Sequence, residues 1–153
     1  MFKSGDIAGV LIRPLTRHND SRGWLAEFYR IDELDGYAPV MSYISVTNPD
    51  IMRGPHEHIE QTDYFCFFGK FMLYLWDNRK NSPTYGNKMV IEDANGLVAL
   101  VPPGVVHAYK NTGDADGMVI NLPDRLFAGR EKKEKVDEVR HENNPESPFK
   151  VDE

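Results

Sequence analysis

The sequence predicts an all-β domain, a jelly roll or a related small barrel, with a charged tail after it. Apolar residues come in short bursts that are rich in β-branched and aromatic side chains, and Gly, Pro, Asn or Asp separates each burst from the next. With 153 residues, 41% of them hydrophobic and 27% charged, the chain fits a single globular domain, 1–153, with its own hydrophobic core.

The expected strands are, in chain order, WLAEFYRI, YISVTN, TDYFCFF, KFMLYLW, LVALV, VVHAYKN and GMVINL. Gly69 is predicted to reverse the chain between the third and the fourth, and Pro-Pro-Gly at 102–104 between the fifth and the sixth. The barrel core should run from about 9 to 127. From about 130 to 153 the chain is strongly charged and has few apolar residues, so we expect a short, mostly exposed helical tail.

Charge and cysteine content exclude some classes of function. A net charge of −6 gives no basis for expecting nucleic acid or an anionic membrane as a partner. No apolar run is long enough to cross a bilayer and the N-terminus lacks the plan of a signal peptide, so we expect a cytoplasmic protein. Cys66, the only cysteine, cannot form an intramolecular disulfide and is expected to be a small buried hydrophobe.

The stretch RGPHEHIEQ, residues 53–61, contains two histidines separated by one residue. In a strand, residues i and i+2 point to the same face, so His56 and His58 should project together. Glu57 and Glu60 should then face the other side and be solvated. A lone histidine is usually structural, but a third one, His107, follows in a second motif, which favours a functional site.

That second motif, GLVALVPPGVVHAYKN at 96–111, matches the second motif of the cupin superfamily, Gly-x5-Pro-x-Gly-x2-His-x3-Asn, at every spacing. The first cupin motif has His-x-His, an acid three or four residues on, and then Gly; the acid position here holds Thr62 or Asp63. The resemblance implies a cupin β-barrel in which His56, His58 and His107 converge. Three imidazoles could bind a divalent metal such as Fe, Mn, Ni or Zn, although no cofactor is our first expectation.

Five segments in order, DSRGWLAEFYR, MRGPH, WDNRKNSPTYG, VPPGVVHAY and VRHENNP, resemble the dTDP-4-dehydrorhamnose 3,5-epimerase family from about residue 9 to 145. The resemblance implies a metal-free cupin homodimer whose substrate is a nucleoside-diphosphate 4-keto-6-deoxyhexose. The 4-keto group acidifies the protons at C3 and C5. A histidine removes one of these protons, and a tyrosine reprotonates the opposite face of the sugar.

Carried onto this sequence, the resemblance makes His56 the base, with His58 or His107 as its partner. Arg53 would hold the sugar or its enolate, and Arg22 would reach a phosphate, including one bound across the dimer. The further substrate-binding candidates are Gln61, Tyr109 and Asn121.

The family pattern is incomplete here. Asn121 and Phe127 fall where its tyrosine hydroxyls belong, and Tyr109, Tyr85 or Tyr64 are the candidates for a substitute acid. Three further family positions, a lysine, an acid and the aspartate that orients the base, align with Thr62, Leu73 and Asn144. This favours a single epimerisation, or another shift of the same enolate, over a double epimerisation.

Other functions stay open. RGPHEHIEQ also resembles the Arg-Gly-x-His-x-His segment of nucleotide-sugar 3,4-ketoisomerases, in which two histidines move a proton on one face of the sugar. A metal-dependent cupin is a further alternative. Loss of the tyrosine, lysine and aspartate equivalents would also fit a non-catalytic sugar-nucleotide-binding module, or a structural or regulatory partner of a polysaccharide-assembly enzyme.

Overall fold

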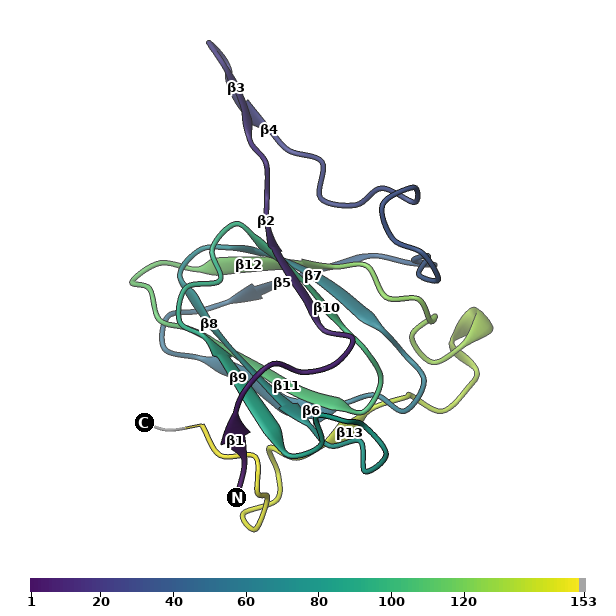
Figure 1. Cartoon of the computed structure of the whole chain (residues 1–153). Coiled ribbons are helices and arrows are strands. Elements are labelled where there is room, and N and C mark those ends of the chain that lie inside the picture. Colours follow the sequence, from purple (N-terminus) through teal and green to yellow (C-terminus); the bar gives the residue numbers. More distant parts are fainter. Residues whose placement is uncertain (152–153) are drawn as a thin grey trace.

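The computed structural model describes residues 1–151, which form two facing sheets and a separate hairpin (Figure 1). The six-stranded sheet has the order β1 (Lys3–Ser4), β9 (Asn87–Ile91), β8 (Phe71–Asp77), β11 (Val105–Asn111), β6 (Met52–Glu57) and β13 (Val139–Arg140). The five-stranded sheet has the order β2 (Leu11–Pro14), β10 (Leu97–Val101), β7 (Asp63–Phe68), β12 (Gly117–Asn121) and β5 (Tyr43–Thr47). The hairpin pairs β3 (His18–Asp20) with β4 (Gly23–Leu25). The all-β prediction is confirmed.

Both predicted reversals occur where the glycines allow them. Gly69, with φ +118°, lies between β7 and β8, and Gly104, with φ +74°, lies between β10 and β11. The expected strand WLAEFYRI is wrong beyond Leu25, because the chain from 26 to 42 has no strand. Phe28 and Tyr29 in this segment instead pack on the outer face of the five-stranded sheet, in the cluster that contains Tyr64.

The core lies between the two sheets and is largely aromatic. Phe65 and Phe67 of β7 meet Phe71 of β8 and Tyr109 of β11, with ring centroids 5.5 to 5.9 Å apart. Tilted and edge-on contacts of this kind add to the free energy that the burial of each ring contributes. The interior around these four rings is therefore filled with side chains.

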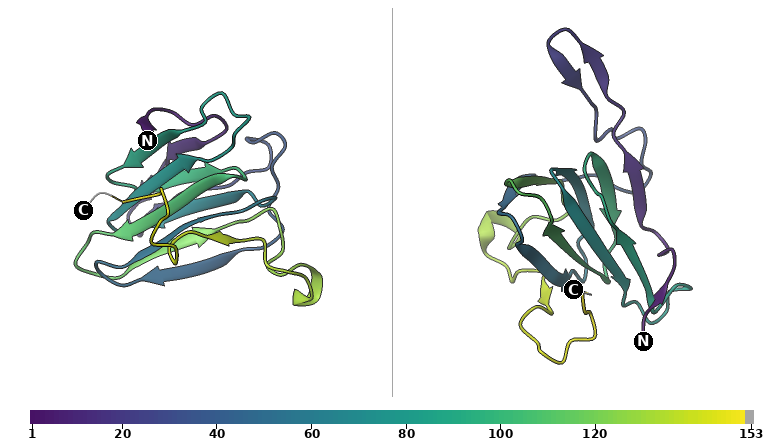
Figure 2. Two further views of the ribbon diagram at one scale, coloured as in Figure 1. Left: turned by 90° about the horizontal axis from the view of Figure 1, so that it is seen from below. Right: turned by 90° about the vertical axis from the view of Figure 1, so that its left-hand side faces the viewer.

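The C-terminal segment covers the outer face of the six-stranded sheet, in a loop visible below the barrel in the right-hand view of Figure 2. Phe149 is buried against Trp76, with ring centroids 6.0 Å apart.

Glu57 faces this outer side, as its place in the strand predicts. It is nevertheless buried, because the Asn78 amide and the His141 ring both hydrogen-bond its carboxylate, at 2.8 and 2.9 Å. The expectation that Glu57 is solvated is wrong.

The predicted helical tail is also wrong for the described residues. Between 128 and 151 the only helical element is the 3₁₀ turn Arg130–Lys132, and β13 follows it at the edge of the six-stranded sheet. Pro145 and Pro148 cannot donate helical hydrogen bonds, and burial of Phe149 holds the chain against the barrel. Residues 152 and 153 of the predicted tail lie outside the described part.

The hairpin of β3 and β4 extends away from the barrel (Figure 2). All six residues of its strands are exposed, and Trp24 lies 6.3 Å from the Phe68 ring of the five-stranded sheet. Arg22, in the turn, pairs with Asp20 and keeps 87% of its side chain exposed. Nothing within residues 1–151 therefore buries this arm.

The motif WDNRKNSPTYG is organised by one carboxylate. Asp77, fully buried at the end of β8, accepts hydrogen bonds from the Arg79 guanidinium, the Ser82 hydroxyl and the Thr84 hydroxyl, at 2.6 to 2.9 Å. Thr84 in turn accepts from the backbone N–H of Ala8. Burial alone would raise the pKa of Asp77, but these donors lower it to about 2. The motif thus closes its own loop and ties the N-terminal segment, at Ala8, to the barrel.

Replacing Asp77 by Asn should destabilise the fold, because the buried amide loses the charge-assisted bonds to Arg79. We expect a loss of about 2–3 kcal/mol in the free energy of unfolding, measured by urea denaturation. Asp114→Asn, at an exposed position, is the matched control and should change stability by less than about 0.5 kcal/mol. Equal stability of the two variants would show that the Asp77 network does not hold the loop.

Candidate functional site

Three histidines meet between the sheets. His56 lies on β6 and His58 directly follows that strand; both rings point inward, and His107 of β11 is the direct cross-strand partner of His56. The ring centroids are 4.3 Å apart for His56 and His107, and 5.6 Å for His56 and His58. Gly54 permits this approach, since a Cβ there would lie 2.5 Å from the His107 carbonyl oxygen. The predicted convergence is present.

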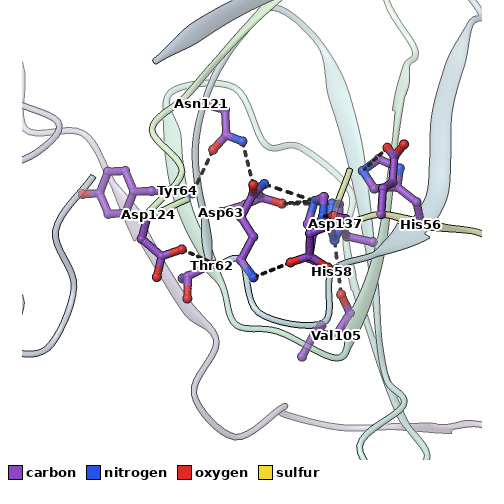
Figure 3. A network of polar contacts seen from close by, with 12 residues as sticks. His56, His58, Thr62, Asp63, Tyr64, Val105, Asn121, Asp124 and Asp137 are labelled. Carbon is purple, nitrogen blue, oxygen red and sulfur yellow. Dashed lines mark hydrogen bonds and ion pairs between the residues drawn. The ribbon is translucent and has the colours of Figure 1, made fainter. Parts of the chain in front are cut away.

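A buried carboxylate lies beside the histidines (Figure 3). Asp63, the first residue of β7 on the opposite sheet, has its Oδ2 3.1 Å from Nε2 of His58 and 3.3 Å from Nε2 of His107. Its Oδ1 accepts hydrogen bonds from the amides of Gln61 and Asn121, both at 2.8 Å. Sequence reasoning placed Asp63 only at the acid position of the cupin motif and missed it as a site residue.

Two neighbouring imidazoles of the site have opposite protonation states. Burial alone would lower the pKa of His58, but the hydrogen bond and charge of Asp63, with the carbonyl of Asp137, raise it to about 9. His58 is therefore a cation at neutral pH. Burial first, and then the other two histidines, hold the pKa of His56 far below its usual value, so His56 is neutral and can accept a proton.

His107 lies deeper than the other two. Its side chain is 1% exposed, its Nδ1 is 3.2 Å from the Val105 carbonyl oxygen, and its Nε2 makes no hydrogen bond to any described residue. Burial, partly offset by Asp63, lowers its pKa. His107 thus supports His56 from behind and does not line the cavities described next.

Two adjacent cavities open beside His56. The first, about 390 Å³, includes His58 and Gln61 in its lining; the second, about 530 Å³, includes Arg53 and Tyr109. Four residues line both cavities: Tyr43, His56, Glu138 and Arg140. His56 therefore stands where the two spaces meet, within reach of a ligand that occupies either one.

Three other predicted site residues, Arg53, Asn121 and Arg22, lie in different parts of the structure. Arg53 lines the second cavity and also crosses to β5, where it donates to the Thr47 hydroxyl at 3.0 Å and to the Val46 carbonyl at 2.7 Å. Asn121 is fully buried with its amide bonded within the protein, so it lies behind the cavity wall. Arg22 lies in the extended hairpin, away from the cavities of its own chain.

Sequence reasoning also missed the acidic segment of the C-terminal region at the rim. The Asp137 carboxylate accepts from three successive backbone N–H groups, those of Ile59, Glu60 and Gln61. A carboxylate oxygen of Glu138 is 4.0 Å from Nε2 of His56. Asn144, to which the family's base-orienting position was assigned, instead lies in an exposed turn and binds the Glu146 N–H. A two-residue strand such as β13 carries too short a pattern to be recognised in sequence.

The same residues could hold a metal ion. One nitrogen from each of His56, His58 and His107 lies within 4.8 Å of the others, and imidazole suits zinc, iron, copper and nickel. The unbonded Nε2 of His107 fits such a role. The Asp63 carboxylate already lies within 3.3 Å of two of the three rings, so it can compensate positive charge in this cluster without an ion.

Comparison with known proteins decides the family. The family model for dTDP-4-dehydrorhamnose 3,5-epimerases matches residues 4–136. The chain belongs to this family. Its relatives include the probable low-salt glycan biosynthesis epimerase Agl13 of Haloferax volcanii, 37% identical over 80% of this chain and 81% of that protein. The spore coat polysaccharide biosynthesis protein SpsL of Bacillus subtilis is 32% identical over 74% of this chain and 78% of its own.

Solved structures of a sugar isomerase and a sugar epimerase share the fold. A dTDP sugar isomerase from Desulfovibrio desulfuricans superposes with a TM-score of 0.80 over 94% of this chain and 91% of its own, at 22% identity. The 3'-monoepimerase ChmJ from Streptomyces bikiniensis, solved with dTDP-quinovose, gives 0.72 over 84% of this chain and 69% of its own, at 22% identity. The predicted cupin jelly roll is confirmed, and membership of the family supports an isomerase that acts on sugars. Within residues 1–151, no helix has the length and apolar character needed to cross a membrane.

The His58–Asp63 pair predicts how stability depends on pH. The pKa of His58 is raised on folding, so its contribution is complete below about 6.5, the unfolded value, and is lost as the pH rises through about 9. In the native protein, the melting temperature should therefore decrease as the pH is raised from about 6.5 to about 9. His58→Gln, which cannot titrate, should reduce this slope, as measured by thermal melts from pH 6 to 10. The same slope in both proteins would contradict a cationic His58.

Proposed function

We propose that the protein enolises a nucleoside-diphosphate 4-keto-6-deoxyhexose, with His56 as the base that removes the proton next to the carbonyl. The observation that carries this proposal is the position of His56 where the two cavities meet, with the ring of His58 5.6 Å away. A neutral imidazole can take the proton, and a fixed positive charge beside it stabilises the enolate oxygen that develops.

Arg53 supplies a second positive group, at the wall of the other cavity, where it can hold the sugar or its enolate. Glu138, near Nε2 of His56, favours the imidazolium formed after proton transfer and can orient the base in place of the family's aspartate. We infer that Thr62 and Asn121 stand where the family's lysine and one of its tyrosines belong. Because the pattern is altered, a single epimerisation fits better than a double one.

We further propose a cytoplasmic homodimer. The outer face of β5 and β12 exposes Ile44, Val46 and Met118, at 63%, 51% and 37%. These alternate with inward-facing residues, so one sheet face presents a continuous apolar surface of the kind that another subunit covers. The projecting hairpin could then reach the second copy and bring Arg22 to a substrate phosphate there.

A 3,4-ketoisomerase is the second candidate. His56 on β6 and His58 just after it project to the same side, with ring centroids 5.6 Å apart, an arrangement that can move a proton between neighbouring carbons on a single face of the sugar. A metal-dependent cupin and a non-catalytic sugar-nucleotide-binding protein are the remaining alternatives, the first of them favoured by the spacing of the three imidazoles.

One experiment separates these functions. The protein is incubated in D₂O with dTDP-4-keto-6-deoxyglucose, C3 and C5 are followed by NMR, and metal is measured in the same preparation. Deuterium at either carbon supports enolisation, and a carbonyl moved from C4 to C3 indicates the ketoisomerase. Absence of exchange together with stoichiometric metal would point to a metal-dependent cupin. Absence of both would leave a binding function and overturn the proposal.

Replacing His56 by Asn should lower the rate of deuterium exchange at least about 100-fold, because the proton acceptor is lost. His141→Asn is the matched control: it lies on the outer side of the same sheet, bonded to Glu57, and should leave exchange per folded molecule unchanged. Exchange is measured by the NMR assay above. Undiminished exchange in the His56 variant would assign the base to another residue.

Replacing Arg22 by Ala should raise KM about tenfold or more with little change in kcat, since the residue is proposed to bind phosphate and not the reacting carbon. A cross-dimer role adds a sharper test. Mixed dimers of the Arg22→Ala and His56→Asn chains contain one site with both native residues, so mixing should restore part of the activity. An unchanged KM, or no recovery in mixtures that do exchange subunits, would contradict this role.

A further inference from the structure

Epimerisation inverts a carbon, so a second group must donate a proton on the face of the sugar opposite the base. The three histidines do not supply that group. The chain has seven tyrosines, and the structure separates them by position. Tyr29, Tyr37 and Tyr64 cluster on the outer face of the five-stranded sheet, and Tyr74 belongs to the outer cluster of the six-stranded sheet. Tyr85 lies in the exposed loop before β9. Only two tyrosines, Tyr43 and Tyr109, line the cavities at His56.

Tyr109 is poorly placed to act on the face of the sugar opposite His56. It lies on β11, in the same sheet as His56, and its hydroxyl bonds to the Ser45 hydroxyl at 3.1 Å. Its side chain belongs to the aromatic core and is 4% exposed. It therefore approaches the cavity from the same side as the base.

Tyr43 has the opposite placement. It lies on β5 of the five-stranded sheet, which faces the sheet of His56 across the interior (Figure 1). It lines both cavities together with His56 and is 41% exposed, so a ligand can reach it. A sugar ring held between the sheets has His56 on one face and Tyr43 on the other.

The hydrogen bonds around Tyr43 fix the direction in which its hydroxyl can donate. Asn121, its direct cross-strand partner, accepts at Oδ1 from the backbone N–H of Tyr64, at 2.9 Å. That N–H can only donate, so the amide must turn its NH₂ group towards Asp63 and Tyr43, at 2.8 and 3.0 Å. The oxygen of Tyr43 is thus an acceptor here. Its own hydrogen has no acceptor among residues 1–151 and is left for the cavity.

We propose that Tyr43 is the general acid that protonates the enolate carbon on the face opposite His56, an assignment that rests on the proposed function. His56 takes the proton from the carbon next to the carbonyl, and the C–H electron pair becomes the enolate. Tyr43 then gives its O–H proton to the same carbon from the other side, which restores the ketone with inverted configuration. The resulting phenolate regains a proton from water at the cavity mouth, and His56 releases its proton to water, so the enzyme is unchanged.

Two features support Tyr43 in this step. Burial, and then the charge of Asp63, raise the pKa of its hydroxyl, so the proton is present at neutral pH. The amide of Asn121 donates to the oxygen on which negative charge develops, as a stabiliser of the phenolate does. Strand β5 is itself held in place against the opposite sheet by Arg53, through Thr47 and Val46, and by the bond between Ser45 and Tyr109.

Tyr43→Phe tests the assignment in the D₂O assay with dTDP-4-keto-6-deoxyglucose. The variant should fold normally, because Asn121 keeps its bonds to Asp63 and to the Tyr64 N–H, and a thermal melt checks this. Formation of the inverted sugar should fall about 100-fold or more, whereas deuterium exchange with retained configuration continues, since His56 can return a deuteron to its own face. Tyr85→Phe is the matched control and should show the native rates of both inversion and deuterium exchange.

The outcomes separate the two proposals. If Tyr43→Phe still inverts the carbon at the native rate, Tyr43 is not the acid, while enolisation by His56 stands. If the folded variant loses exchange together with inversion, Tyr43 serves proton removal or binding, and the assignment is overturned. If Tyr109→Phe loses inversion and Tyr43→Phe keeps it, the acid is Tyr109. If the native protein shows no exchange, the proposed function fails and the role of Tyr43 fails with it.

Discussion

The site depends on one buried ionic contact, that of the Asp63 carboxylate with His58. Asp63 comes from one sheet and His58 directly follows β6 of the other, so the contact joins the two halves of the barrel where the cavities open. A carboxylate that is 1% exposed needs compensation, and it receives one cationic ring and two amide donors. The same contact makes His58 a cation, whereas burial, and then the charges of His107 and His58, hold the pKa of His56 down and keep it neutral. The ionic contact therefore sets the charge of one histidine, and burial sets that of its neighbour.

Much of the fold and part of the site could be predicted from the sequence. The period of two put His56 and His58 on one face, and the spacing of the second motif brought His107 to them. Both tight turns were found because glycine adopts their backbone angles without a steric cost. The strands β7, β8 and β11 were recognisable because each is a run of six or seven residues rich in aromatic and apolar side chains.

The rest depended on tertiary contacts that local patterns do not encode. In β5 the apolar residues Ile44 and Val46 face outward, and the polar series Tyr43, Ser45 and Thr47 faces the interior, the reverse of the usual rule. Sequence reasoning that puts apolar residues inside therefore overlooks Tyr43. The charged tail suggested an exposed helix because a single aromatic residue, Phe149, gives little signal of a docking site.

The position of β13 has a consequence for how this scaffold can diversify. Residues 136–142, which contain this strand, contribute Glu138 and Arg140 to the partition between the cavities, yet only two of them pair with the sheet. Exchanges at Arg140, whose side chain is 60% exposed, would leave the aromatic interior and the contacts of Asp137 with His58 and with residues 59–61 intact. New sugar specificities could thus arise by exchanging one border side chain, at small thermodynamic risk to the barrel.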